Sequence, residues 1–486
     1  MSGAVDRLTP VERGLFIDGN EVEAHGGGTA AIIDPASTEV IAQVAAATAS
    51  DVDRAVRGAA ERYTSGVWRS APVRVRRDVL RGIADLVRRD RDRLAEVESR
   101  NAGKPIAAAR GEIGAVAAVF DFYAGAVDKI HGQTIPSQAE GTLLTFREPL
   151  GVCAAITPWN FPMLIMAWKV APALAMGNSV VVKPAGVTPL TALDLAALAV
   201  EAGLPPGVLN VVPGSGGEAG EALVGHPMIR KISFTGSTEI GARVMRQGAD
   251  GIRRVSLELG GKSASLVFAD ADLDVCIESS IFAAYDNAGQ DCCARSRILV
   301  DRSIFEEFVD RFTQRAGSLR VGDTQDETTE VGPLISAAHR TAVERHVASG
   351  EEDGATRVCG GERPDLPGSY LTPAVLTGVR SDMRIMREEV FGPVVAILPF
   401  DSETEAVALA NDSIYGLSGS IWTRDIGRAL RVARGVETGM LSINSSSSVH
   451  IEAPFGGVKQ SGIGREQGMV ALDHYSEYKS VFIAAD

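Results

Sequence analysis

Cys292 is the residue of this chain best placed to act as a nucleophile. It lies in a glycine-containing loop, Asn-Ala-Gly-Gln-Asp-Cys-Cys, that spans residues 287–293. A carboxylate, Glu258, lies earlier in the chain, in the segment Leu-Glu-Leu-Gly-Gly-Lys of residues 257–262. A thiol with an acid elsewhere in the chain can form a nucleophile and base pair. Because a free cysteine is more often a small buried apolar residue, this interpretation requires a cofactor site and oxyanion donors elsewhere in the chain.

The composition is that of a globular chain with more than one structural unit. Its 486 residues exceed what one core usually holds, so we expect two or three units. The chain has 62 acidic and 48 basic residues, a formal net charge of −14. This excess of acids argues against a nucleic-acid partner and against an anionic membrane surface.

Cysteine use and the apolar segments favour a cytoplasmic protein. Five irregularly spaced cysteines form no disulfide framework, and the seven histidines show no zinc-binding motif, so we predict no metal site. The first 21 residues lack the apolar core of a signal peptide. The longest apolar region, 162–177, is interrupted by Lys169 and Pro172 and is too short to span a bilayer.

Apolar runs that alternate with helical patterns predict a parallel sheet between residues 151 and 259. Short strands and turns are expected over the first 50 residues, and helical spacing follows from Ser50 to Asn101. Five strands are expected in the first sheet, at 152–156, 179–182, 208–212, 231–234 and 255–259, with a helix at 189–202. A second set has strands near 264–268, 298–300 and 394–399 and helices near 303–316 and 403–411. The sequence therefore predicts two α/β units, the first ending near residue 260.

Two glycine turns in this region could each bind a pyrophosphate. Gly236 and Ser237 follow a strand and open a helix, whose free N–H groups favour an anion. The segment 214–219 matches the dinucleotide fingerprint Gly-x-Gly-x-x-Ala literally and also lies between a strand and a helix. Either could be a plain strand-to-helix turn. Lys183 ends a strand, at the position where open α/β sheets bind ligands. The same pattern also fits an exposed lysine at a strand end that binds no ligand.

Seven segments in order resemble the aldehyde dehydrogenase superfamily over nearly the whole chain. They are Ile-Thr-Pro-Trp-Asn-Phe-Pro (156–162), Val-Lys-Pro (182–184), Phe-Thr-Gly-Ser (234–237), Leu-Glu-Leu-Gly-Gly-Lys (257–262), Gly-Gln-Asp-Cys (289–292), Glu-Glu-Val-Phe-Gly-Pro (388–393) and Pro-Phe-Gly-Gly-Val-Lys-Gln-Ser-Gly (454–462). The resemblance implies a Rossmann-like coenzyme domain (1–130 and 150–259), a second α/β catalytic domain (260–450) and a small β oligomerisation arm (131–149 and 475–486).

The resemblance also implies an NAD site. Gly236 and Ser237 would face the pyrophosphate, with the Gly214 turn only adjacent, Lys183 would bind the adenosine ribose, and Glu389 the nicotinamide ribose. The remaining expected cofactor residues are Ile156, Thr157, Pro158, Trp159, Glu258, Leu259, Gly260 and Phe391. Many NAD-preferring relatives carry an acid three positions after the lysine, where this chain has Gly186. Because that acid would repel a 2′-phosphate, we expect NAD with NADP possible.

The implied reaction is oxidation of an aldehyde to its carboxylic acid. Cys292 would form a thiohemiacetal whose oxyanion is bound by the Asn160 amide and the Cys292 N–H. After oxidation to a thioester, Glu258 would activate the hydrolytic water, with Lys169 and Glu466 as a proton path. One alternative is a relative that passes the acyl group to coenzyme A, against which Glu258 argues because it can activate water. The other is a non-catalytic structural relative, against which Cys292, Glu258 and Asn160 all argue.

The sequence is least informative about the aldehyde. Expected substrate residues are Phe161, Trp168, Asp291, Cys293 and Val449. Asp291 could favour an aminoaldehyde or a betaine-aldehyde-type substrate, or it could cap a local turn. The loop Ser445–Val449 lacks the aromatic residues of a cation-binding cage.

The assembly is expected to be a homodimer or homotetramer. The polar segment 132–147 predicts an extended hairpin, and Ser480–Ile483 predicts a strand that pairs outside its own domain. Exposed strands of this kind are a liability unless another subunit covers them.

Overall fold

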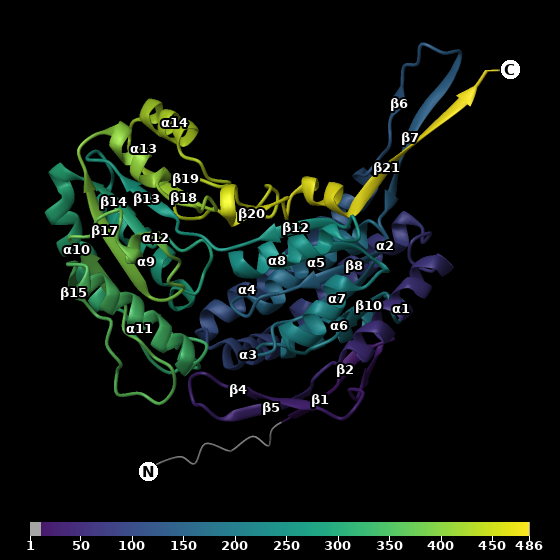
Figure 1. The fold of residues 1–486 in the computed structure, drawn as a ribbon, viewed down its shortest axis with the longest axis horizontal. Helices are drawn as coiled ribbons and strands as arrows, with labels where there is room; N and C mark the ends of the chain where they lie inside the picture. The colour runs from purple at the N-terminus through teal and green to yellow at the C-terminus, as the bar shows by residue number, and fades with distance from the viewer. Residues whose placement is uncertain (1–10, 486) are drawn as a thin grey trace.

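The computed structural model describes residues 11–485, which form two α/β units and a projecting arm (Figure 1). Figure 1 shows the arm extending from the side of the first unit, far from the second. Among the described helices, none is both long and apolar enough to cross a membrane.

The first unit is built on an eight-stranded sheet whose five central strands are parallel. This confirms the predicted parallel sheet. The strand order is β20 (Gly462–Ile463), β12 (Arg254–Glu258), β11 (Ile229–Thr235), β8 (Val152–Ile156), β9 (Ser179–Lys183), β10 (Leu209–Val211), β2 (Leu15–Ile17) and β3 (Asn20–Val22).

Helices cover both faces of this sheet because its central strands carry buried side chains on both sides, most of them apolar. One core contains Cys153, Ala155 and Val182 and lies under α2 (Val73–Arg89), α3 (Arg91–Ala102), α4 (Ile106–Ala126), α5 (Pro162–Ala175) and α6 (Leu190–Glu201). The opposite core contains Ala154 and Ile232 and lies under α1 (Ala49–Ser65), α7 (Glu221–Gly225) and α8 (Thr238–Ala249).

The segment expected to be helical from Ser50 to Asn101 contains three helices, α1 to α3. Gly66 ends α1 in the left-handed conformation at φ +78°, Pro72 precedes α2, and Asp90 separates α2 from α3. The spacing of apolar residues indicates which face of each helix is buried. It hardly changes where one helix ends and the next begins, so the sequence did not separate the three helices.

The second unit is a seven-stranded sheet, and both predicted helices lie on it. Its order is β15 (Thr356–Cys359), β16 (Ala374–Thr377), β17 (Val394–Phe400), β14 (Arg297–Asp301), β13 (Ala264–Val267), β18 (Gly419–Trp422) and β19 (Ser442–Ile443). The helices around it are α9 (Leu273–Tyr285), α10 (Phe305–Gly317), α11 (Ala337–Glu352), α12 (Arg384–Arg387), α13 (Glu403–Asn411) and α14 (Ile426–Gly435).

Two small sheets complete the fold. One joins β1 (Val11–Arg13), β5 (Val40–Ala45) and β4 (Thr29–Ile33). The arm joins β21 (Ser476–Ala484), β7 (Gly141–Pro149) and β6 (Thr134–Ile135), with β21 antiparallel to β7 over nine residue pairs. The predicted hairpin and C-terminal strand therefore meet within one chain. Between β20 of the first sheet and β21 of the arm lies a 3₁₀ segment, η6 (Met469–Tyr475).

Candidate active site

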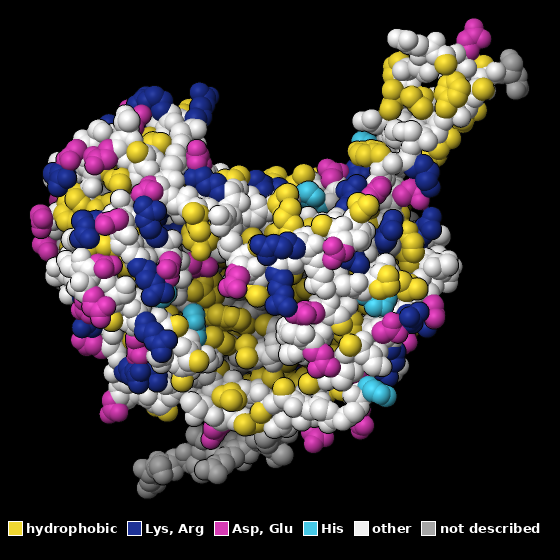
Figure 2. Space-filling model, viewed as in Figure 1, with side chains coloured by type: hydrophobic (Ala, Val, Ile, Leu, Met, Phe, Trp, Pro, Cys, Tyr) yellow, Lys and Arg dark blue, Asp and Glu magenta, His cyan; other side chains and the backbone are white. Residues whose placement is uncertain are grey.

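A cavity of about 770 Å³ lies at the carboxyl ends of the parallel strands of the first sheet. Ile156, Lys183, Thr235 and Glu258 end β8, β9, β11 and β12, and all four line it. This is the edge at which open α/β sheets bind ligands. Figure 2 shows the molecule hollowed between the two units, with apolar side chains in the hollow.

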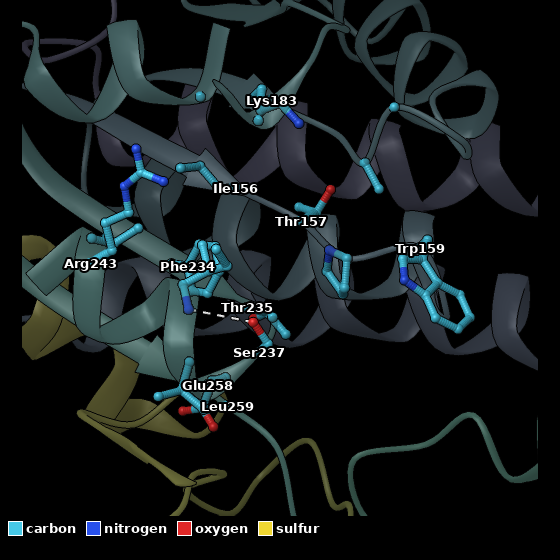
Figure 3. A pocket seen from close by; sticks show the side chains of 18 of the residues that line it. Ile156, Thr157, Trp159, Lys183, Phe234, Thr235, Ser237, Arg243, Glu258 and Leu259 are labelled. Atoms are coloured by element: carbon cyan, nitrogen blue, oxygen red, sulfur yellow. Dashed lines mark hydrogen bonds between the residues drawn. The ribbon is translucent and has the colours of Figure 1, made fainter. Parts of the chain in front are cut away.

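Every residue expected to bind the cofactor lines this cavity. They are Ile156, Thr157, Pro158, Trp159, Lys183, Gly236, Ser237, Glu258, Leu259, Gly260, Glu389 and Phe391. Asn160 and Cys292 line it as well. Figure 3 shows side chains that line the cavity, with Trp159 at one end and Arg243 at the other.

Both glycine turns lie on the cavity. Gly236 and Ser237 begin α8, and the Ser237 Oγ accepts from the Ile240 N–H at 3.4 Å. The resemblance left the Gly214 turn only beside the cofactor site, whereas residues 214–217 line the same cavity. A Cβ added to Gly216 or Gly217 would meet nothing within 4 Å. This turn therefore leaves open space where a ligand can approach the backbone.

Two buried polar side chains face the cavity with little of their bonding capacity used. The Lys183 ammonium donates to the Pro184 carbonyl at 3.0 Å, and burial lowers the pKa of Lys183 to about 8. The Glu389 carboxylate accepts from the Gly261 N–H at 2.9 Å, and burial raises the pKa of Glu389 to about 7. A donor and an acceptor of this kind fit the hydroxyl groups of two riboses. The cavity thus suits a dinucleotide in its polar groups as well as its glycines.

Aromatic rings close the end of the cavity near Cys292. Trp159 packs edge-on against Phe391 and His339, at ring-centroid distances of 5.2 and 5.4 Å. Phe391 has a φ of +56°, a strained conformation for a bulky residue, and its carbonyl lies 2.7 Å from the His339 Nε2. His339 was not predicted, because it lies on α11, in a segment without a motif.

The loop before Cys292 is held in an unusual conformation. Asn287, Ala288 and Gly289 are all left-handed, at φ +51°, +56° and +69°. A Cβ at Gly289 would lie 2.2 Å from the Gly392 carbonyl oxygen, so only glycine fits there. The Gln290 side chain fixes the loop further: its Nε2 donates to the Asn287 carbonyl at 3.0 Å, and its Oε1 accepts from the Ile335 N–H at 2.8 Å.

Asn160 lies next to this loop, and one N–H of its side-chain amide has no acceptor among residues 11–485. The Asn160 Nδ2 donates to the Gln290 backbone carbonyl at 2.9 Å, and the Asn160 backbone carbonyl accepts from the Asn287 Nδ2 at 3.0 Å. A side-chain amide has two N–H donors. The second can therefore bind an oxygen in the cavity without loss of the contact that orients the side chain.

Cys292 and Glu258 both lie in surroundings that disfavour their charged forms. A hydrogen bond with Cys293, and then burial, raise the pKa of the Cys292 thiol well above its usual range. Burial, and then the neighbouring Glu466, raise the pKa of Glu258 well above its usual range. Neither carboxylate oxygen of Glu258 has a hydrogen-bond partner among residues 11–485. These surroundings therefore favour the neutral form of each group over its charged form.

Lys169 and Glu466 lie behind the cavity in direct contact with each other. The Lys169 Nζ donates to Glu466 Oε1, to the Thr235 hydroxyl at 2.7 Å and to the Ser233 hydroxyl at 3.2 Å. Neither residue lines the cavity, but the charges of both act on Glu258.

The five expected substrate residues do not line the cavity. Phe161, Trp168 and Cys293 belong to the apolar cluster that packs against Cys292. The Trp168 ring lies 4.8 Å from that of Phe455, a contact that the sequence did not indicate. Val449 is 41% exposed on the loop after β19.

Asp291 forms the contact expected of a turn cap. Its Oδ1 accepts from the Cys293 N–H at 2.9 Å, and burial raises its pKa. The ligand-type atoms of Asp291, Cys292 and Cys293 lie within 4.8 Å of one another. Two of these groups are already engaged, Asp291 by the backbone and Cys293 by the Cys292 thiol, so we assign no metal to them.

The chain matches the model of the aldehyde dehydrogenase family over residues 22–481. It is 42% identical to betaine aldehyde dehydrogenase of Bacillus subtilis over 475 residues, 96% of each chain. It is 44% identical to human retinal dehydrogenase 2 over 472 residues, covering 96% of this chain and 91% of the relative.

Solved structures show the same fold over nearly the whole chain. An NAD⁺ complex of aldehyde dehydrogenase from Bacillus cereus is 43% identical, with a TM-score of 0.96 over 98% of this chain and 97% of that chain. A betaine aldehyde dehydrogenase from Staphylococcus aureus in complex with NAD⁺ is 39% identical, with a TM-score of 0.95 over 97% and 94%.

Proposed function

Because the chain belongs to the aldehyde dehydrogenase family, we propose that its cavity oxidises an aldehyde to the carboxylic acid with Cys292 as nucleophile. One observation carries the assignment of roles: Cys292, Asn160 and Glu258 share a cavity with all twelve residues expected to hold NAD. The cofactor is NAD, as in the two NAD⁺ complexes that share this fold.

The residues that would hold NAD divide along the cavity. Gly236, Ser237 and the N-terminus of α8 would bind the pyrophosphate, and Lys183 and Glu389 the two riboses. When bound, the nicotinamide supplies the acceptor for the hydride that the substrate carbon gives up. NADP use is a further part of the proposal, because Gly186 places no acid beside Lys183.

Cys292 makes the aldehyde carbon tetrahedral so that a hydride can leave it. As the thiol attacks, its proton passes to a base, and Glu258 is the carboxylate on the cavity with unused oxygens. The free N–H of Asn160 and the Cys292 N–H bind the resulting oxyanion. Removal of one such donor typically costs about 10²–10³ in rate.

Glu258 then serves the hydrolysis of the thioester. Its raised pKa suits a group that accepts a proton from water near neutral pH. Lys169 and Glu466 lie behind it and would carry that proton away. This use of water favours release of a free acid over transfer to coenzyme A.

The substrate is an aldehyde, and the group that the aldehyde carbon bears is not assigned. A betaine aldehyde dehydrogenase and a retinal dehydrogenase are similar to this chain at 42% and 44%, although their substrates differ in charge and size. A betaine-aldehyde-type specificity is not favoured, since Asp291 already binds the Cys293 N–H. We place Phe161, Trp168, Cys293 and Val449 on the substrate side by family resemblance.

The larger organisation is proposed on the same basis. Residues 1–130 and 150–259 would form the coenzyme domain, 260–450 the catalytic domain, and 131–149 with 475–486 the oligomerisation arm of a cytoplasmic homodimer or homotetramer. The exposed apolar side chains of Phe146, Phe482 and Ile483 on the arm support a role in assembly.

The test is NADH formation with a panel of aldehydes, with and without coenzyme A. Cys292→Ala should abolish oxidation and leave NAD binding near normal. Glu258→Gln should accumulate the acyl enzyme, seen as added mass on the protein. Cys359→Ser is the matched control and should oxidise aldehydes as the wild type does, because it changes a thiol on β15, outside the cavity.

Oxidation by Cys292→Ala would contradict the proposed nucleophile. Unchanged turnover by Glu258→Gln would require another base. Nucleotide binding without turnover of any aldehyde would favour the non-catalytic alternative.

A further inference from the structure

One face of the first sheet changes from apolar to polar at its last two parallel strands. On this face β8 and β9 present Cys153, Ala155 and Val182. The next strand, β11, presents Lys231, Ser233 and Thr235 at alternate positions. Its neighbour β12 presents Ser256 and Glu258, in register with Ser233 and Thr235.

All five polar side chains are at most 9% exposed, and Lys231 is 1% exposed. Burying polar and charged groups costs stability unless they are paired. Packing alone therefore does not explain why these polar side chains line two adjacent strands next to the catalytic Glu258 carboxyl.

The polar side chains of this face form a row, here called the file, that runs from Glu466 behind the cavity through Ser233 and Ser256 to Lys231. Ser233 donates from Oγ to Glu466 Oε1 at 2.9 Å, and Glu466 is bonded to Lys169. At the other end, the Lys231 Nζ donates to the Ser256 Oγ. Ser233 and Ser256 are register partners in adjacent strands, which lie about 4.8 Å apart.

Lys231 lies at the amino end of the file, next to the surface. The preceding residues Ile229 and Arg230 line an open cleft of about 320 Å³ at the base of the arm, as does Arg254, the register partner of Lys231. Lys231 is itself buried, but its neighbour Arg254 is exposed in that cleft, so a proton on Lys231 lies close to solvent at the end of the strand away from the cavity.

We infer that Lys231 receives, through Ser233 and then Ser256, the proton that Glu258 takes from the Cys292 thiol during acylation, and releases it at the amino end of β11. This inference rests on the proposed function, in which Glu258 is the base for thioester hydrolysis. It adds a positioned proton acceptor beyond Lys169 and Glu466.

The chemistry balances without a further reactant. The water oxygen bonds to the acyl carbon, one water proton passes to Glu258, and the C–S bond breaks with its electron pair on the Cys292 sulfur. The other water proton stays on the carboxylic acid until that product ionises, and Glu258 returns the first water proton to the Cys292 thiolate. Before hydrolysis, however, Glu258 still carries the thiol proton from acylation and must lose it to act as a base, and a neutral Lys231 amine is the acceptor.

The charged and titratable groups around Lys231 come from several elements. Cys153 on β8, Glu466 and Lys169 face it, as does Arg254 on β12. His474 and Tyr475 of η6 lie beside it, the Tyr475 ring centroid 5.5 Å from the ammonium. No carboxylate among residues 11–485 forms an ion pair with Lys231. Burial lowers the pKa of Lys231 to about 7, so the amine can cycle near neutral pH.

The experiment follows the acyl enzyme without cofactor, using 4-nitrophenyl acetate and the full-length protein. The burst of 4-nitrophenolate measures acylation of Cys292, and the steady rate measures deacylation. Lys231→Met should keep the burst and lower the steady rate about tenfold between pH 7 and 8. Hydroxylamine, which attacks the thioester without Glu258, should restore the steady rate.

Three further variants separate proton transfer from structure. Lys231→Arg keeps the positive charge but cannot release a proton, so it should be as slow as Lys231→Met. Ser256→Ala should slow deacylation in the same way. Ser265→Ala is the matched control and should leave it unchanged, because that buried hydroxyl accepts from Trp422 on the second sheet.

Wild-type deacylation in Lys231→Met, or full recovery in Lys231→Arg, would overturn the inference. A burst that persists in Cys292→Ala would instead overturn the proposed function, and that result does not depend on Lys231. Thermal unfolding checks each variant for folding, and Lys231→Met should be at least as stable as the wild type.

Discussion

At the scale of single residues, the surroundings of the site raise the pKa of both reactive groups. The sulfur atoms of Cys292 and Cys293 lie within 4.8 Å of each other, and neither oxygen of the Glu258 carboxyl has a hydrogen-bond partner among residues 11–485. An unpaired thiolate in such surroundings would be costly. Ionisation of the Cys292 thiol is therefore expected to accompany substrate attack, with the Glu258 carboxylate as the base.

Asp291 is the residue whose role most affects substrate choice. Its carboxylate already accepts from the Cys293 N–H, and asparagine can accept the same bond. We expect Asp291→Asn to change kcat/KM for a trimethylammonium aldehyde and for a neutral aldehyde of similar length by the same factor, within about twofold. The measurement is the ratio of the two kcat/KM values. A selective loss of about tenfold for the cationic aldehyde would instead identify Asp291 as its binding group.

Gly186 provides a test of cofactor choice. A Cβ there would meet only the Gly214 carbonyl oxygen, at an ordinary 3.5 Å, so a longer side chain fits. We expect Gly186→Glu to lower kcat/KM with NADP at least about tenfold by repelling the 2′-phosphate, while kcat/KM with NAD stays within about twofold. Gly186→Ala, which adds bulk without charge, is the control. Equal losses with both cofactors would contradict the electrostatic explanation.

At the scale of elements, strand ends and helix starts converge on one edge of the first sheet. Four parallel strands end in cavity residues, and α8 begins there with Ser237 as its N-cap. The arm is the element that these contacts leave exposed. Figure 2 shows apolar side chains gathered near its tip.

The arm should need a second copy of the chain to cover it. Phe482 is 47% exposed on β21, and a charge there would oppose burial in a subunit interface. We expect Phe482→Lys to shift the protein toward smaller species in sedimentation velocity. Phe282→Lys, on α9 and 65% exposed, is the control that should leave the assembly unchanged. A monomeric wild-type protein would contradict the role of the arm.

At the scale of the molecule, the cavity draws its walls from both units. Lys183, Ser237 and Glu258 come from the first, while Cys292, Glu389 and Phe391 come from the segment that carries the second. A ligand that binds only the folded chain therefore holds the two units together.

NAD should stabilise the whole chain against heat. At a hundred times Kd, binding adds about 2.7 kcal/mol to the free energy of unfolding. We expect a single transition whose midpoint rises with NAD concentration in differential scanning fluorimetry. The rise should be smaller for Glu389→Gln, which removes the acceptor that the second unit provides. A midpoint insensitive to NAD would contradict this arrangement.

Much of the site could be predicted because its residues belong to short motifs at strand ends. The apolar runs of β8, β9, β11 and β12 locate the carboxyl edge of a parallel sheet, and the residues that follow each run must meet there. This reasoning places Lys183, Glu258 and both glycine turns at that edge. The resemblance was needed to choose the Gly236 turn over the Gly214 turn and to assign roles to Glu258, Cys292 and Asn160, because each is ambiguous as a single residue.

Tertiary structure alone decided the contacts that no single motif indicates. It brought His339 against Trp159, Phe455 against Trp168, and the Gly214 turn onto the cavity. It also aligned Lys231 with Ser256 behind Glu258, since that proximity depends on the register of two strands. The sequence by itself determined which chemical groups exist and which strand ends carry them. Burial and register decided which of those groups face one another, because both are set by packing between residues far apart in the chain.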